Sequence, residues 1–314
     1  MKNSDFIQMS QCHIFSIKFP TDNIKEVLEQ AEIDVGDSYT QVEIVKNPMT
    51  DQKVQELENG LFFTVRATFK KVTKELLSAK IYELKQKAKE RPDLVPPNNE
   101  KEWRLEAEMQ LFHTVPFSSE LVNIFYSPEK ELLITNSRSK HTKLALHHLI
   151  KLFGLAGFRS VVVSDEKLGL NTRLKDYLAE GKPMFKFLNF KHEATLVNRE
   201  EGDETFLNCR HLSDERGKIK ALEALSKGFR VRSAQMHYDE GNFPVHFKLD
   251  GNLKLRSMRF SECSDVSKQL NAPNFAAKSL AFTEYLESQL NALLKIAECT
   301  VLEFVNETKL ESFV

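Results

Sequence analysis

The most distinctive chemical pattern in this chain is an alternation of basic and apolar side chains between Phe229 and Phe260. Successive side chains of a β-strand point to opposite faces of its sheet, so the alternation predicts strands with one apolar and one basic face. The basic members of the pattern are Arg230, Arg232, Lys248, Lys254 and Arg256. Solvated faces usually mix both signs of charge, so a face of one sign indicates an anionic partner. Simple solvation of the outer side of a sheet is the alternative.

The stretch LDGNLKL predicts how two of these strands pair. A three-residue loop at 250–252 keeps the apolar side chains of both strands on one face, whereas a two-residue turn would mix the faces. This register places Leu249 opposite Leu253 and Lys248 opposite Lys254. Like charges that face each other across an antiparallel pair repel.

Two phase changes in the alternation predict β-bulges, which twist and bend a sheet. One is near Ser233. The other is at Ser257 and returns Met258 and Phe260 to the apolar face, so it decides whether Arg259 joins the basic face. The acidic residues of this region, which are predicted to lie in turns outside the basic face, are Asp239, Glu240 and Asp250.

A second basic cluster begins a helix predicted within RSKHTKLALHHLIKLFG. Its cationic members are Arg138, Lys140 and Lys143. The helix dipole disfavours cations at this end, but free backbone N–H groups together with cations make a phosphate site. An exposed helix start without a ligand is the alternative. A third basic run, from Lys80 to Arg91 on the predicted projecting helix, is expected to be solvated but available to a phosphate backbone.

Signatures of catalysis are absent from the sequence. Neither GxxxxGK[ST] nor GxGxxG occurs, so nucleotide-hydrolysing and dinucleotide chemistry are not indicated, and there is no GxSxG motif. The four cysteines form no CxxC pair, and His147 and His148 are expected on a helix surface. Glu83-Leu84-Lys85 has the ExK spacing of some nucleases but lies in a lysine-rich helical pattern. We expect no catalytic residue, no metal site and no cofactor.

The net charge of −1 conceals a strong segregation of charge. Residues 1–137 contain 17 Lys and Arg against 22 Asp and Glu, and residues 261–314 contain 4 against 8. Residues 138–260 contain 23 against 15, a balance of +8. Such a segment can present a local positive field while the whole protein stays near neutrality. Chance segregation is the alternative.

The order of the predicted elements indicates an α+β fold with mixed antiparallel sheets. Two helices, at about residues 73–91 and 99–113, flank RPDLVPPNN and predict a projecting helical hairpin. A long C-terminal helix is expected from about Asn274 to Glu298. We predict a central α/β region at 1–72 and 119–170, the hairpin at 73–118, and a sheet-and-helix region with the basic meander at 171–314. No signal peptide or transmembrane segment is apparent, and the unpaired cysteines favour the cytoplasm.

Several stretches together resemble the bacterial recombination-associated RdgC family. They are ELLITNSRSKHTKLALHHLIKLFG, FLNCRHLSDE, DGNLKLRSMRF and NFAAKSLAFTEYLESQLNALLKIA, with a looser match at ENGLFFTVRATFKKV. The resemblance covers nearly the whole chain and is weakest over the first fifty residues.

The resemblance implies a homodimer that closes into a ring, with double-stranded DNA passing through a positively lined hole. Family members bind DNA without sequence preference and restrain strand exchange by RecA, so the protein is expected to be non-enzymatic and nucleoid-associated. The family's basic position before the helix at Ser213 falls on Cys209 or Arg210, of which only Arg210 carries a charge. A hydrophobic ring contact falls on Pro116 or Phe117, and we select Phe117. The alternatives are a metal-dependent DNA nuclease, and a protein-interaction module with no DNA role.

Overall fold

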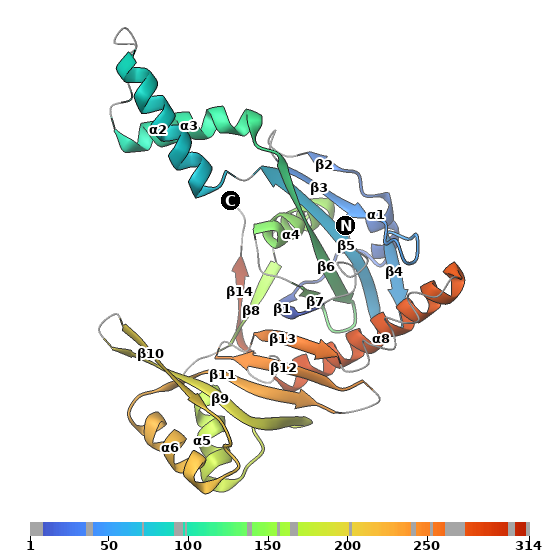
Figure 1. The fold of residues 1–314 in the computed structure, drawn as a ribbon. Helices are drawn as coiled ribbons and strands as arrows, with labels where there is room; N and C mark the ends of the chain where they lie inside the picture. The colour runs from blue at the N-terminus through green and yellow to red at the C-terminus, as the bar shows by residue number, and fades with distance from the viewer. Residues whose placement is uncertain are drawn as a thin grey trace.

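The structure, a computed structural model, is an α+β fold built around one long, curved antiparallel sheet (Figure 1). It describes residues 9–35, 40–70, 72–90, 97, 99–136, 140–155, 158–163, 169–200, 203–239, 243–251, 254–260, 274–300 and 305–311. Within these ranges the strands belong to a single fourteen-stranded sheet.

The sheet has an N-terminal and a C-terminal half. The N-terminal half contains β1 (Gln11–Ser16), β2 (Asp34–Val35), β3 (Thr40–Val45), β4 (Val54–Leu57), β5 (Gly60–Lys70), β6 (Phe117–Ser127) and β7 (Leu132–Thr135). The C-terminal half contains β9 (Leu188–Glu200), β10 (Asp203–Cys209), β11 (Arg230–Tyr238), β12 (Val245–Asp250) and β13 (Leu255–Phe260). The strand order is β10-β9-β11-β12-β13-β1-β7-β6-β5-β3-β2, with β4 beside β5. Strand β8 (Phe158–Val163) pairs with both β1 and β14 (Val305–Glu311).

Helices cover both faces of this sheet, and a helical hairpin projects from it. The described helices are α1 (Ile24–Gln30), α2 (Lys74–Glu90), α3 (Glu100–Thr114), α4 (Lys140–Leu152), α5 (Leu170–Glu180), α6 (Glu215–Ser226) and α8 (Phe275–Cys299). Helices α5, α6 and α8 contribute to one hydrophobic core, and α1 and α4 contribute to another. The described chain thus has two cores, one on each side of a shared sheet.

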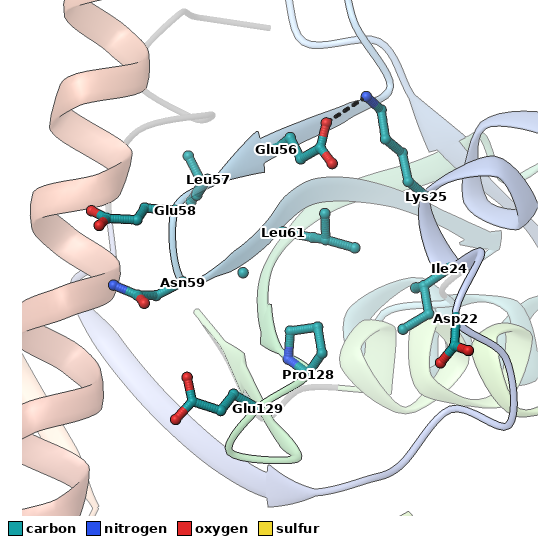
Figure 2. A pocket seen from close by; sticks show the side chains of 11 residues that line it. Asp22, Ile24, Lys25, Glu56, Leu57, Glu58, Asn59, Leu61, Pro128 and Glu129 are labelled. Atoms are coloured by element: carbon teal, nitrogen blue, oxygen red, sulfur yellow. Dashed lines mark hydrogen bonds and ion pairs between the residues drawn. The ribbon is translucent and has the colours of Figure 1, made fainter.

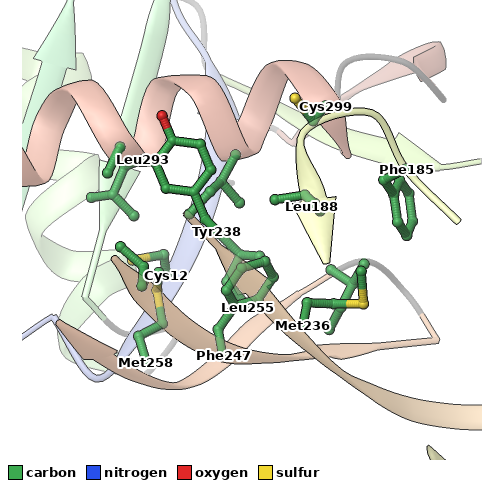
Figure 3. Packing of buried hydrophobic residues seen from close by; sticks show 14 of the residues in the cluster. Cys12, Phe185, Leu188, Met236, Tyr238, Phe247, Leu255, Met258, Leu293 and Cys299 are labelled. Carbon is green, nitrogen blue, oxygen red and sulfur yellow. The ribbon is translucent and has the colours of Figure 1, made fainter. Parts of the chain in front are cut away.

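The larger core fixes the apolar face of the C-terminal strands. Figure 3 shows Tyr238, Phe247 and Leu255 packed beside Leu293 of α8. Phe247 and Leu255 are at most 3% exposed, and burying side chains of this kind contributes about 1.5–3 kcal/mol each. Because their apolar side chains are held under α8, these strands turn their basic side chains to the opposite face.

That opposite face lies on the same side of the sheet as α4. Cys12 of β1 and Leu255 of β13 are paired, and both belong to the core under α8. The adjacent pair, Gln11 and Arg256, therefore points the other way. Phe15 shares that side with Gln11 and packs into the core that includes α4. Figure 1 shows α4 on the inner side of the curved molecule, so the basic strands also present their polar face inward.

Helices α2 and α3 form a hairpin that projects from the end of β5 and β6 (Figure 1). The side chain of Asn99 caps α3 by accepting the N–H of Glu102 at 3.0 Å. At the base of the hairpin, Lys70 Nζ donates to the carbonyl of Phe112 at 2.6 Å and lies 5.0 Å from the ring centroid of Phe117. The hairpin is thus fixed to the sheet at its base, while α2 buries none of its residues.

The α+β class, the projecting hairpin and the long C-terminal helix are all present as the sequence predicts. Helix α8 begins after Asn274, whose side chain accepts the N–H of Ala276 at 2.9 Å. None of the described helices is long and apolar enough to cross a membrane. One expectation is wrong: His148 is only 4% exposed, because it lies on the side of α4 that packs against the sheet.

Buried His148 predicts a loss of stability in acid. Burial lowers its pKa in the folded protein, although Asp34 opposes this shift. A histidine in the unfolded chain has a pKa of about 6.5. The unfolded chain therefore binds more protons below this pH, and stability falls until the pH reaches the lowered folded value. Urea unfolding of the wild type and of His148→Leu at pH 7.5 and 5.5 should show a larger acid loss in the wild type. Equal losses would contradict this assignment.

Candidate nucleic-acid interface

A groove of about 870 Å³ opens on the polar face of β9, β11, β12 and β13, and we call it the basic groove. Its cationic lining residues are Arg199, Arg230, Arg232, Lys248 and Arg256, and its carboxylates are Glu204 and Asp250. The rest of the lining is uncharged, so five cations and two anions leave a net charge of +3. The structure therefore brings four of the cations predicted from the strand pattern together on one surface, and adds Arg199.

The turn between β12 and β13 lies one residue further along the chain than the sequence predicts, so the strands pair in a different register. Lys248 lies opposite Arg256, so the expected pairing of Lys248 with Lys254 is wrong. The turn closes at Lys254 instead, because the N–H of Asp250 donates to the Lys254 carbonyl at 3.0 Å. The N–H of Lys254 in turn donates to Oδ1 of Asp250 at 2.9 Å. Two cations therefore still face each other across β12 and β13, but the partner of Lys248 is Arg256.

Gly251 anchors this turn to β11. Its N–H donates to the carbonyl of Arg232 at 2.8 Å, and a Cβ atom at this position would lie 2.7 Å from the carbonyl oxygen of Val231. Glycine permits that close approach. Asp250 follows the buried Leu249 in β12 and so lies on the polar face, where its Oδ2 accepts a hydrogen bond from Nε of Arg256 at 3.0 Å. The prediction that Asp250 stays outside the basic face is therefore wrong.

Arg199 of β9 is a member of the groove that the sequence analysis missed. It lies opposite Glu204 of β10, and its Nε is 2.9 Å from Oε1 of that carboxylate. The second oxygen, Oε2, is 3.4 Å from Nη1 of Arg232. Strand β9 pairs with both β10 and β11, although α6 separates β10 from β11 in the sequence. Alternation within β9 was the local signal for Arg199, but its nearness to Arg232 depends on this non-local pairing.

Arg230 and Lys248 differ from the other cations of the groove. The two groove carboxylates engage Arg199, Arg232 and Arg256. Neither Arg230 nor Lys248 contacts a carboxylate within the described ranges, and both are exposed. They are therefore the cations most available to an anionic ligand.

Arg210 lies at the edge of the basic groove. It lines a smaller hollow of about 250 Å³, which also includes Glu193 and shares Lys248 with the basic groove. Arg210 is exposed, whereas the adjacent Cys209 is buried, and this burial raises the pKa of the Cys209 thiol. Arg210, which was chosen from the RdgC resemblance, thus lies next to Lys248, which was chosen from the strand pattern.

The predicted bulge at Ser257 is confirmed. The pairing of β12 with β13 shifts register at this point, and Ser257 has a φ of 51°. Met258 and Phe260 return to the core, while Arg259 is exposed and lies opposite His246. Arg259 therefore joins the polar face.

A stacked pair of histidines continues this face. The rings of His246 and His237 lie 4.1 Å apart between centroids. Partial burial lowers the pKa of His246, and the neighbouring cations Lys191 and Arg259, together with His237, act in the same direction. The positive charge of the face thus extends beyond the groove itself.

The remaining predicted basic residues lie elsewhere. Lys254 contributes its backbone to the turn and does not line the basic groove. Lys140 and Lys143 begin α4, in the N-terminal half, and the Nζ of Lys140 lies 4.9 Å from the ring centroid of Phe69. Arg138 falls outside the described residues.

The ExK tripeptide lies on the hairpin, with both charged side chains in ion pairs. Glu83 contacts Lys80 at 3.1 Å and Lys87 at 2.6 Å, while Lys85 contacts Glu100 of α3 at 2.7 Å. These contacts lower the pKa of Glu83, with Lys87 the larger cause. In the part of the chain that the structure describes, no group of three or more His, Cys, Asp or Glu side chains is arranged to hold a metal ion.

A separate hollow of about 340 Å³ lies near α1 and the turn between β4 and β5 (Figure 2). Its charged lining residues are Asp22, Glu56, Glu58, Glu129 and Lys25. Lys25 Nζ is 2.8 Å from Oε2 of Glu56. Four carboxylates and one lysine make this hollow unsuitable for a polyanion, so the basic groove is the better candidate interface.

No protein-family model matches the sequence of this chain, and no curated protein matches it. The charge and geometry of the basic groove are therefore the main grounds for assigning a function.

The electrostatics of the polar face predict how His246 titrates. Replacing Arg259 with glutamine removes one nearby positive charge, so the pKa of His246 should rise towards its ordinary value. The measurement is an NMR titration of the His246 Cε1–H resonance in the wild type and in Arg259→Gln. Lys227→Gln, at the exposed end of α6, serves as the control and should leave the titration unchanged. A His246 that titrates identically in all three proteins would rule out this account of the face.

Proposed function

We propose that this protein binds double-stranded DNA without sequence preference through the basic groove. The observation that carries the proposal is that four strands bring five cations together in one groove. Two of these cations, Arg230 and Lys248, contact no carboxylate among the described residues. Phosphate groups are the ligands that arginine and lysine favour in such an arrangement. Binding through phosphates positions a duplex without reading its sequence.

The dimensions of the groove are compatible with an extended anionic ligand. Neighbouring strands are about 4.8 Å apart, so the three intervals from β9 to β13 cover about 14 Å. A duplex carries one charge per about 1.7 Å of its axis, so several phosphates face a surface of this width. A small metabolite would instead favour an enclosed, mainly apolar pocket with a few polar groups.

The proposal extends to a ring-shaped homodimer that encircles DNA and restrains RecA-driven strand exchange on the nucleoid. The resemblance to the RdgC family supports this part. So do the inward direction of the polar face and the projecting hairpin (Figure 1). The hairpin and its base expose large apolar side chains that suit a contact with a second copy, namely Leu76, Tyr82, Leu105, Met109 and Phe117.

Charge reversal in the groove should weaken binding to all duplexes equally. The double variant Arg230→Glu/Lys248→Glu removes the two cations that no carboxylate engages. We expect an affinity loss of at least about tenfold, because hydrogen bonds to charged groups contribute about 1.5–3 kcal/mol each. The slope of log K against log salt should also become shallower by about 0.9 per lost phosphate contact. Fluorescence anisotropy with two unrelated duplexes over a salt series measures both quantities.

Arg216→Glu is the matched control, since Arg216 is exposed on α6, which covers the opposite face of the sheet. A loss confined to one duplex would indicate base readout, and absence of binding at low salt would reject the function. The same duplexes should stay intact with magnesium or manganese present. Their degradation would favour a metal-dependent nuclease.

Phe117→Ser should open one of the two ring contacts without separating the protomers. Phe117 is 50% exposed and lies at the base of the hairpin, so it is available to a partner. Light scattering should still report a dimer, while small-angle X-ray scattering should report a larger radius of gyration than in the wild type. Phe275→Ser, at a position 53% exposed, is the control and should change neither. A monomeric wild type at micromolar concentration would refute the dimer.

A further inference from the structure

One carboxylate in the basic groove bridges two arginines from different strands. Oε1 of Glu204 lies 2.9 Å from Nε of Arg199, and Oε2 lies 3.4 Å from Nη1 of Arg232. The three side chains are 40%, 75% and 52% exposed, respectively. This arrangement presents two guanidinium groups to a single small anion at the surface.

Strand pairing explains why the two arginines converge. Arg199 and Glu204 are direct partners across β9 and β10, and Arg230 of β11 lies opposite Val197 of β9. The register shift between Val231 and Ser233 makes Arg232 the extra residue of a bulge beside β9. Its guanidinium lies 4.7 Å from the ring centroid of Phe206 on β10. The guanidinium of Arg232 therefore contacts both an aromatic ring and a carboxylate of β10.

We propose that Arg199 and Arg232 form a phosphate site, which the carboxylate of Glu204 occupies in the free protein and which a backbone phosphate of the nucleic acid takes over on binding. This inference deepens the proposed function, on which it rests. A carboxylate and a phosphate offer guanidinium groups similar pairs of acceptor oxygens. An exposed ion pair of this kind stabilises a protein only slightly, so a ligand with several charges can displace it.

Glu204 is better suited to this exchange than the other carboxylate of the groove. Asp250 also contacts an arginine, but it is only 13% exposed and accepts the N–H of Lys254, which fixes it in the turn. The contacts of Glu204 within the described ranges are those with Arg199 and Arg232. Its side chain can therefore leave the two arginines without breaking a turn or a strand pair.

The experiment compares Glu204→Gln with the wild type in duplex DNA binding over a salt series. Loss of the competing carboxylate should strengthen binding and make the slope of log K against log salt steeper by about 0.9, which corresponds to one more phosphate contact. The gain in affinity should accordingly be about 3.5-fold larger at 50 mM than at 200 mM salt. Asp203→Asn is the matched control, because Asp203 is exposed on the same strand and its side chain points to the other face. It should leave the slope unchanged.

A second variant separates a phosphate site from a general change in charge. In an Arg199→Gln/Arg232→Gln background, Glu204→Gln should no longer steepen the slope, since the site that it frees is gone. An equal effect of Glu204→Gln in both backgrounds would overturn the proposal.

An NMR titration with inorganic pyrophosphate provides a readout that does not depend on DNA. The Nε–Hε resonances of Arg199 and Arg232 should shift at lower pyrophosphate concentration in Glu204→Gln than in the wild type. Unchanged DNA binding and unchanged pyrophosphate shifts in Glu204→Gln, with binding still lost in Arg230→Glu/Lys248→Glu, would reject the site and leave the proposed function standing. If the wild type binds no duplex, the proposed function fails, and the pyrophosphate titration alone decides whether the anion site exists.

Discussion

The backbone hydrogen bonds of β1 connect the two halves of this molecule. Along one edge β1 pairs first with β13 and then with β8, and along the other edge it pairs with β7. These pairings make one continuous sheet of what would otherwise be two. They also fix how the faces of the two halves correspond, because side chains alternate between the faces of a sheet. A slip of one residue in β1 would turn its own side chains to the opposite faces, with Gln11 under α8 and Cys12 on the polar face.

The cations of the basic groove repel one another, but they must also stay accessible if they are to bind an anionic ligand. Lys248 and Arg256 face each other across two strands, which is unfavourable in the absence of an anion. Asp250 offsets part of this repulsion, and Glu204 does the same for the arginines near β10. The sheet can therefore fold with five cations on one face and still present a surplus of positive charge to a ligand. The hydrophobic core under α8 supplies the stability that this arrangement lacks.

Much of the fold followed from local patterns. The period of two predicted the strands from Arg230 to Phe260, and its phase change at Ser257 correctly predicted the bulge that places Arg259 on the polar face. The prolines after α2 indicated the hairpin, and Asn274 marked the start of α8. The register of the β12–β13 turn was predicted wrongly. Hydrophobic matching favoured a turn at 250–252, whereas the observed turn closes through a hydrogen bond between Asp250 and Lys254, and Gly251 joins it to a third strand through the carbonyl of Arg232.

The sequence by itself determined which residues carry charge, which of them alternate with apolar neighbours, and hence that a basic face exists. The tertiary structure decided which cations share the groove and which carboxylates join them. Strand β9 comes to lie between β10 and β11 because β11 returns to pair with it after α6, and this brings Arg199 and Glu204 next to Arg232. No local period encodes such a contact, because it depends on hydrogen bonds between segments that are distant in the chain.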